Sequence, residues 1–191
     1  MFDTSLFTVD KVSRGLNQDG DAVKMISGVT YGTYTTYTEK EKGDIPDSVK
    51  AGDVLRVSKD GTQVTKVEVV ANTGASFVPS IKYYDGSTNM YEHDFIVHSG
   101  YLYGKSDRAV SVLTPEENVA QYGKIVSHAV NANAKVTVWD SAKKEAKAGT
   151  MADVMTNDIP DGNGNISVSE NSTKVIVYRR QDYVREIVVI K

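Results

Sequence analysis

A strand–turn–strand pattern that occurs twice constrains the fold of this chain more than any other feature. Residues 53–70 and residues 174–190 each contain a β-branched run, a short polar turn and a second β-branched run. In the first copy the turn is Lys59-Asp60-Gly61. An internal repeat of this size predicts two copies of one β-unit. We therefore expect the two segments to form antiparallel strand pairs in equivalent positions of two similar folds.

Short alternating runs and turn signals account for most of the remaining chain. Phe7 and Val9 alternate with polar residues, as in a half-buried strand, and Phe95 and Val97 repeat this pattern. Asp19-Gly20 is a hairpin signal, because glycine adopts positive φ without steric cost. Many short strands separated by turns predict an all-β protein. We expect two tandem small β-barrels or sandwiches, OB-like, with few or no helices.

Glycine, proline and small polar residues gather between the two units. Such punctuation is typical of a linker. We assign residues 5–72 to a first β-module, residues 73–90 to a linker and residues 91–191 to a second β-module. Tyr83 and Tyr84 indicate that the linker packs on a neighbouring element.

Three local expectations follow from residue patterns. Residues 122–130 and residues 134–139 are expected to form two separate strands. Residues 149–155 predict one short helical turn, with Thr150 as its cap and Asp153 in its first turn. β-Branched residues at strand spacing predict a buried core. The residues expected there are Val54, Val57, Val67, Val175, Val177, Ile187 and Val189.

Composition excludes several classes of protein. A chain of 191 residues fits one large domain or two small ones. The formal net charge of -3 and the absence of a long basic run argue against nucleic acid as a partner. Without cysteine there can be no disulfide, thiolate metal site or cysteine nucleophile. No apolar run is long enough to span a bilayer, and no signal peptide is visible in residues 1–5.

Motifs for catalysis and cofactor binding are also missing from the sequence. There is no Gly-x-Ser-x-Gly elbow, phosphate loop or dinucleotide-binding glycine pattern. The acidic pair Glu116-Glu117 resembles a solvated turn or a helix start, and nothing singles out a carboxylate pair for acid–base chemistry. His93, His98 and His128 are scattered, and we expect surface or half-buried structural histidines. We therefore expect no enzyme activity, no catalytic residue and no cofactor.

One loop resembles part of a calcium site. The segment Asp161-Gly162-Asn163-Gly164-Asn165 places oxygen ligands at alternate positions, as in the first half of a calcium-binding loop. Ile166 stands where the full pattern needs glycine, and Ser172 stands where it needs glutamate. A plain turn is the better interpretation, and we expect no metal site, although the sequence leaves calcium binding by this loop open.

The best candidates for an interaction surface are tyrosines, of which the chain has eleven. Tyr31, Tyr34 and Tyr37 are spaced by three, so Tyr34 faces away from the other two in a regular strand. With the arginines of residues 179–185 they could stack on bases or sugars. Cross-strand aromatic packing within a sheet is the favoured interpretation. If the chain has a binding surface, we expect it on these tyrosines or on an exposed edge strand.

The run Val49-Lys50-Ala51-Gly52-Asp53-Val54-Leu55-Arg56-Val57, followed by Val64-Thr65-Lys66-Val67, resembles a β-module of Gram-positive surface proteins. Those proteins often carry S-layer homology domains elsewhere in the chain. The second unit resembles a companion module, from its opening strand near residues 95–100 to its closing strands at residues 175–189. Similar strands occur in phage structural proteins. No S-layer homology domain is recognisable, so neither wall anchoring nor any functional residue transfers to this chain.

These observations predict a non-catalytic structural or interaction module of an extracellular assembly. The assembly would be a bacterial surface layer or a phage virion, which places the chain at the cell surface or in the virion. Its partners would be other protein subunits, met by self-assembly or in a larger complex, without membrane insertion. The alternative is an OB-like ligand-binding module for glycan or single-stranded nucleic acid.

Overall fold

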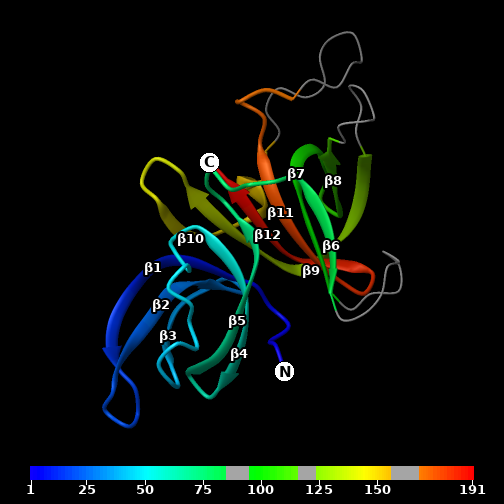
Figure 1. Cartoon of the computed structure of the whole chain (residues 1–191). Helices are drawn as coiled ribbons and strands as arrows, with labels where there is room; N and C mark the ends of the chain where they lie inside the picture. Colours follow the sequence, from blue (N-terminus) through cyan, green and yellow to red (C-terminus); the bar gives the residue numbers. More distant parts are fainter. Residues whose placement is uncertain (85–94, 116–123, 156–167) are drawn as a thin grey trace.

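The computed structural model describes residues 1–84, 95–115, 124–155 and 168–191, and its regular secondary structure is almost entirely β-strand (Figure 1). The first five strands are β1 (Phe7–Leu16), β2 (Ala22–Thr30), β3 (Thr33–Glu39), β4 (Asp53–Asp60) and β5 (Gln63–Asn72). They are followed by β6 (Ser80–Tyr84), β7 (Phe95–Lys105), β8 (Ala109–Thr114), β9 (Lys124–Asp140), β10 (Glu145–Gly149), β11 (Lys174–Arg180) and β12 (Tyr183–Ile190). A 3₁₀ turn, η1 (Met151–Asp153), confirms the expected helical turn. The predicted all-β class is confirmed.

Strands β1 to β5 close into a small barrel in the order β1-β2-β3-β5-β4. β1 pairs antiparallel with both β2 and β4, whereas β3 runs parallel to β5. This is the strand order of an OB fold, a five-stranded Greek-key barrel. The interior is filled by the buried side chains of Phe7, Val9, Ile26, Ile45, Val49, Leu55, Val57 and Val64.

A second barrel repeats this order with different strands. β7, β8, β9, β12 and β11 are joined in sequence around a ring, and β11 pairs back to β7. β9 runs parallel to β12, as β3 runs parallel to β5. Its core consists of Leu102, Val110, Val112, Val130, Val136, Val154, Val175, Val177, Val184, Ile187 and Val189. The expectation of two tandem OB-like barrels is therefore confirmed.

The repeated segments form the β4–β5 and β11–β12 hairpins, which hold the same two places in their barrels. Each hairpin has a two-residue turn whose first residue has a positive φ, 63° at Gly61 and 55° at Gln181. Each second strand then carries a β-bulge, with Thr65 and Arg185 as the extra residues. The two copies therefore share strand order, turn and bulge, as the internal repeat predicts.

One segment differs from the sequence-based expectation, and another adds a strand to the expected linker. β9 is one continuous strand of 17 residues where two strands were expected. Its start pairs with β8 and its end with β10 and β12, and the register with β12 passes over residues 131–134 as an irregularity within the strand. β6 lies within the expected linker, residues 73–90, and pairs antiparallel with β7. Tyr84 holds it there by packing edge-on against Phe95, with ring centroids 5.6 Å apart.

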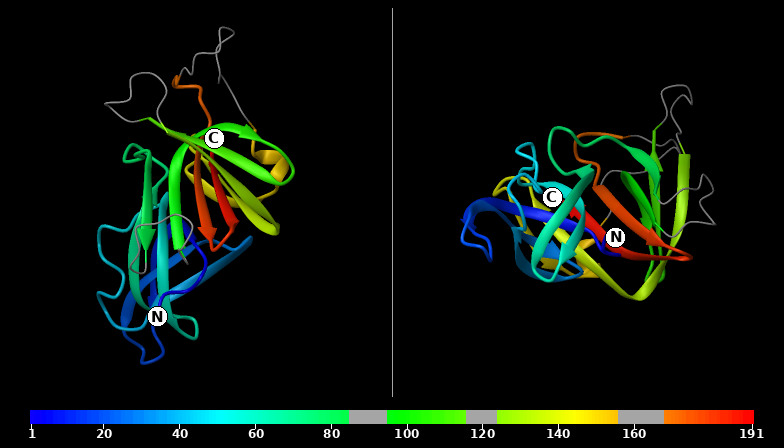
Figure 2. Two further views of the ribbon diagram at one scale, coloured as in Figure 1. Left: turned by 90° about the vertical axis from the view of Figure 1, so that its right-hand side faces the viewer. Right: turned by 60° about the horizontal axis from the view of Figure 1, so that its bottom comes forward.

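The two barrels pack closely against each other (Figure 2), and an apolar cluster separate from both cores fills the space between them. The cluster consists of Leu6, Val54, Val70, Phe95, Val97, Ile176, Tyr178 and Val188. Alternation along a strand explains it, since Val175 and Val177 point into the second core while Ile176 and Tyr178 point towards the first barrel. Strands buried on both faces have nearly continuous apolar sequences, as β11 and β12 do.

The expected core residues divide between these layers. Val57, Val175, Val177, Ile187 and Val189 are buried in the barrel cores, and Val54 is buried in the inter-barrel cluster. Val67 is only half-buried, because it packs at the margin of the first core. The prediction is confirmed except for Val67.

Ile176→Ala, in the inter-barrel cluster, should destabilise the protein as much as Ile187→Ala, in the second core. Both side chains are almost fully buried, so each substitution should lower the free energy of unfolding by about 2–5 kcal/mol. Ile125→Ala is the matched control on an exposed position of β9, with an expected loss of less than about 1 kcal/mol. Denaturant unfolding measures all three. A separate early transition affected only by Ile176→Ala would show that the barrels unfold independently.

Candidate functional site

A buried carboxyl group, Glu186, joins the two barrels. Its residue on β12 is 2% exposed and directly follows the bulge residue Arg185. Oε1 accepts the backbone N–H of Leu6 at 3.0 Å, and the carboxyl group also accepts the backbone N–H of Tyr31. Burial raises the pKa of Glu186 to about 8, and the two backbone donors only partly oppose this rise. Glu186 therefore links the barrels as a buried acceptor of two backbone N–H groups whose pKa is raised by its burial.

Two other buried carboxylates act within the first barrel. Glu39 accepts backbone N–H groups from Lys24 and from the loop at residues 43–45. Asp53 accepts the backbone N–H of Lys50 at 3.0 Å. These contacts fix nearby loops of the same barrel, whereas Glu186 binds the backbone N–H of Leu6, 180 residues away in sequence. The inter-barrel junction is therefore the place where a buried acid has a long-range role.

Asp10, on β1, forms a second link between the barrels. Its Oδ1 accepts the backbone N–H of Ala146 on β10 at 2.7 Å, and its Oδ2 accepts the hydroxyl of Tyr34 at 2.8 Å. Burial and the hydrogen bond to Asp10 raise the pKa of Tyr34. Ala146 also packs with Val29 and Trp139 in a small inter-barrel cluster. These contacts attach the β9–β10 hairpin to the first barrel.

The three tyrosines predicted as an interaction surface lie in two settings. Tyr31 is 42% exposed, and its hydroxyl donates to the backbone oxygen of Asn133 at 3.2 Å. Tyr34 is 49% exposed and reaches Asp10 as described. Tyr37 instead packs on Phe7 in the first barrel, with ring centroids 5.4 Å apart. The structure thus brings Tyr31 and Tyr34 to the junction and leaves Tyr37 in barrel packing. A role in partner binding stays a prediction.

Arg56 of β4 forms a cationic centre within the junction. Its residue is 5% exposed, and its guanidinium carbon lies 4.7, 5.0 and 4.3 Å from the ring centroids of Phe2, Tyr84 and Phe95. The carboxylate of Glu68 lies 3.7 Å from Nη1. A desolvated cation over aromatic faces is stabilised by the ring quadrupoles. Arg56 therefore ties the chain start, β4, β6 and β7 together.

His98 and His128 are completely buried in the second barrel, which corrects the expectation of surface or half-buried histidines. Nδ1 of His98 lies 2.8 Å from Nε2 of His128, and Nε2 of His98 lies 2.5 Å from the hydroxyl of Thr114. These hydrogen bonds satisfy both ring nitrogens of His98 and Nε2 of His128, whereas Nδ1 of His128 is buried without a partner among the described residues. Burial, with a smaller effect of Arg179, lowers the pKa of His128 to about 4. His93 lies outside the described residues.

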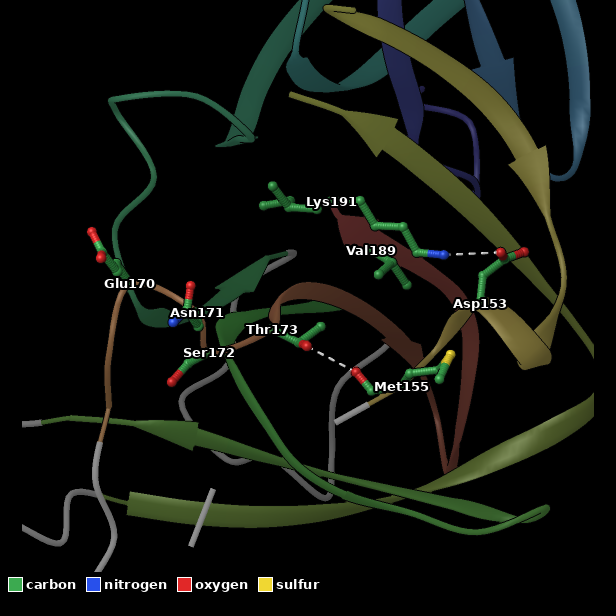
Figure 3. A pocket seen from close by; sticks show the side chains of 9 residues that line it. Asp153, Met155, Glu170, Asn171, Ser172, Thr173, Val189 and Lys191 are labelled. Carbon is green, nitrogen blue, oxygen red and sulfur yellow. Dashed lines mark hydrogen bonds and ion pairs between the residues drawn. The ribbon is translucent and has the colours of Figure 1, made fainter. Parts of the chain in front are cut away.

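A pocket of about 300 Å³ opens beside the end of β12 (Figure 3). The figure shows Lys191 and Asp153 directed at each other, with Nζ and Oδ1 3.1 Å apart. Thr173 donates its hydroxyl to the backbone oxygen of Met155 at 2.8 Å, and Glu170 points away on the opposite side. Because the cation of this pocket is already paired with Asp153, we assign no ligand to it.

In the described parts of the chain, no three His, Asp or Glu side chains are placed to hold a metal ion together. The Asp161–Asn165 segment, weighed as a calcium loop, and the Glu116-Glu117 pair lie outside the described residues. Calcium binding by residues 161–165 therefore stays open, as it is from the sequence alone. Within the described ranges, no helix has the length and apolar character needed to cross a membrane.

Glu186→Gln should make stability less dependent on pH. The carboxyl pKa rises from an ordinary value of 4.5 to about 8 on folding, so the folded state holds more protons than the unfolded state between these values. Linkage then requires the unfolding free energy to fall as the pH rises through this window. Glutamine keeps an acceptor oxygen but does not titrate. Urea unfolding across the window should show a steeper decline for the parent chain, and for the exposed control Glu170→Gln, than for Glu186→Gln. Equal slopes would contradict the assignment.

The sequence matches no model of a known protein family, and a search of curated proteins found no match. The resemblance to modules of Gram-positive surface proteins stays a prediction.

Proposed function

We propose that the chain is a non-catalytic structural and interaction module of an extracellular assembly, a bacterial surface layer or a phage virion. The observation that carries this proposal is the buried junction, which makes one stiff unit of two barrels. A unit of fixed length suits an assembly in which each copy must hold its neighbours at a constant spacing. The extracellular setting is supported by the resemblance of residues 49–67 to modules of Gram-positive surface proteins.

The stiffness of the unit is supported by attachments at separate places. Glu186 binds Leu6 and Tyr31, while Asp10 binds Ala146 on a different strand of the second barrel. An apolar cluster accompanies each of these links. Domains in one chain move relative to each other by default unless their interface is large and hydrophobic. Apolar packing combined with two polar links opposes both hinge bending and twisting.

An exposed strand edge could supply contacts between subunits. Closed barrels have no free edges, so the edges available here come from added strands. β6 pairs with β7 on one side, and no described strand pairs with its other side. The exposed Lys82 at its centre is the kind of charge that limits indiscriminate pairing. We propose that an extended strand of a neighbouring subunit pairs with this edge.

A second candidate function is an OB-like ligand-binding module for glycan or single-stranded nucleic acid. It is favoured by the OB strand order of both barrels, because OB folds bind ligands on the face of their second and third strands. In the first barrel this face carries Tyr34, which is linked through Asp10 to the β10 strand of the second barrel. The net charge of -3 favours glycan over nucleic acid.

A distance measurement tests the stiff unit. Spin labels on Gln18→Cys and Asp107→Cys, exposed positions in different barrels, can be attached selectively because the chain has no cysteine. We expect a single narrow distance distribution by pulsed electron spin resonance. Glu186→Ala should broaden it by removing the buried link, whereas Glu170→Ala should not. A broad distribution in the parent chain would refute the spacer role.

Electron microscopy and ligand screening separate the two candidate functions. The structural proposal predicts ordered sheets, rings or filaments of the purified chain at rising concentration, and immunogold labelling of cell envelopes or virions. Lys82→Pro should reduce the ordered assemblies, because proline removes a backbone donor from β6. A chain that stays monomeric, labels neither structure and binds a glycan or single-stranded oligonucleotide would favour the alternative.

A further inference from the structure

A groove of about 330 Å³ opens at the junction, where the second repeated hairpin meets the first barrel. Thr4 and Ser5 line it from the segment before β1, and Tyr31 lines it from the β2–β3 turn. Arg180 and Arg185 line it from the β11–β12 hairpin. Because both barrels contribute walls, the groove exists only while the barrels are docked.

Neither arginine of the groove has a counter-charge among the described residues. No ion pair involves Arg180 or Arg185 in these ranges. The Nε of Arg185 is buried and has no hydrogen-bond partner there. The carboxyl group of Glu186 already accepts the N–H groups of Leu6 and Tyr31. A buried donor without an acceptor costs free energy, so the described residues leave the guanidinium of Arg185 only partly satisfied beside the groove.

The first repeat shows that the hairpin does not need these arginines in order to form. The residues of β4–β5 that correspond to Arg180 and Arg185 are Asp60 and Thr65. Asp60 pairs with Lys40, with Nζ and Oδ2 2.7 Å apart. The same turn and bulge therefore form with an acid and a neutral residue in these places. The arginine pair is a property of the groove and not a requirement of the fold.

The remaining walls add polar groups and an aromatic surface. The hydroxyl of Ser5 lies 3.1 Å from that of Thr30. Tyr31 has a φ of 43°, rare for a residue other than glycine, and is held there by Glu186 and Asn133. Its ring is partly exposed beside the arginines. Two guanidinium groups with nearby hydroxyls form a donor set that matches carboxylate and phosphate oxygens.

We propose that this groove binds an oxyanion, the carboxylate or phosphate group of an acidic glycan. Arg180 and Arg185 would hold the oxyanion, and the ring of Tyr31 would pack against the sugar. A short groove with two arginines does not match the repeated phosphates of a nucleic acid, and the net charge of -3 provides no attracting field. The proposal does not depend on the structural role proposed above.

Titration calorimetry on the full chain tests the site, with inorganic phosphate, glucuronate and an oligogalacturonate at constant ionic strength. We expect saturable binding that is tightest for the oligomer. Arg185→Gln should weaken it by about tenfold or more, because a charge-assisted hydrogen bond is lost. Arg185→Lys should weaken it less, because lysine keeps the charge but not the planar fork. Arg108→Gln, at an exposed arginine in the β7–β8 turn, is the charge-matched control and should not change it.

Each other result overturns all or part of the proposal. Absence of binding, or binding unchanged by Arg185→Gln, excludes the groove as the site. If binding depends on the arginines but the oligogalacturonate binds no more tightly than phosphate or glucuronate, the groove binds small free oxyanions and the glycan part of the proposal is wrong. Tighter binding of single-stranded DNA than of the oligomer replaces the glycan with a nucleic acid. Circular dichroism and unfolding midpoints check the fold of each variant, and Arg185→Lys carries the test if Arg185→Gln does not fold.

Discussion

The hydrogen bonds that Glu186 accepts from the first barrel are the constraint on which the arrangement of the two barrels depends. Backbone N–H groups of Leu6 and Tyr31 would be costly to bury without an acceptor, and one carboxyl group of the second barrel serves both. The contact fixes where the segment before β1 and the β2–β3 turn must lie. The apolar cluster around it can then exclude water, and that exclusion in turn raises the pKa of Glu186.

The internal repeat explains how such a junction can arise. Both hairpins need one apolar face for their own barrel. In β11 and β12 the second face is apolar too, so it can cover the other barrel. The copies differ where they meet. β4 presents Arg56 to a group of aromatic rings, whereas β11 presents Ile176 and Tyr178. Two copies of one unit thus became complementary partners within one chain.

Local patterns in the sequence were sufficient for much of the fold. Alternation and the Asp60-Gly61 turn predicted the strand pairs, and the repeat predicted their equivalent places. The sequence missed features that depend on neighbours distant in the chain. Residues 131–133 have the composition of a turn but lie as a register irregularity within one long strand, and the buried His98 meets His128 and Thr114 from other strands. The uninterrupted apolar run from Ile187 to Ile190 is typical of a strand buried on both faces. It was the sequence signal from which the contact between the barrels could have been predicted.

The bond between Leu6 and Glu186 also defines how the molecule would carry mechanical load. It connects the segment before the first strand directly to the last strand, across about 180 residues of intervening chain. Tension applied between these two segments would pass through β12 and its lateral pairing with β9 and β11. The strands would then be loaded in shear, with several backbone hydrogen bonds sharing the force.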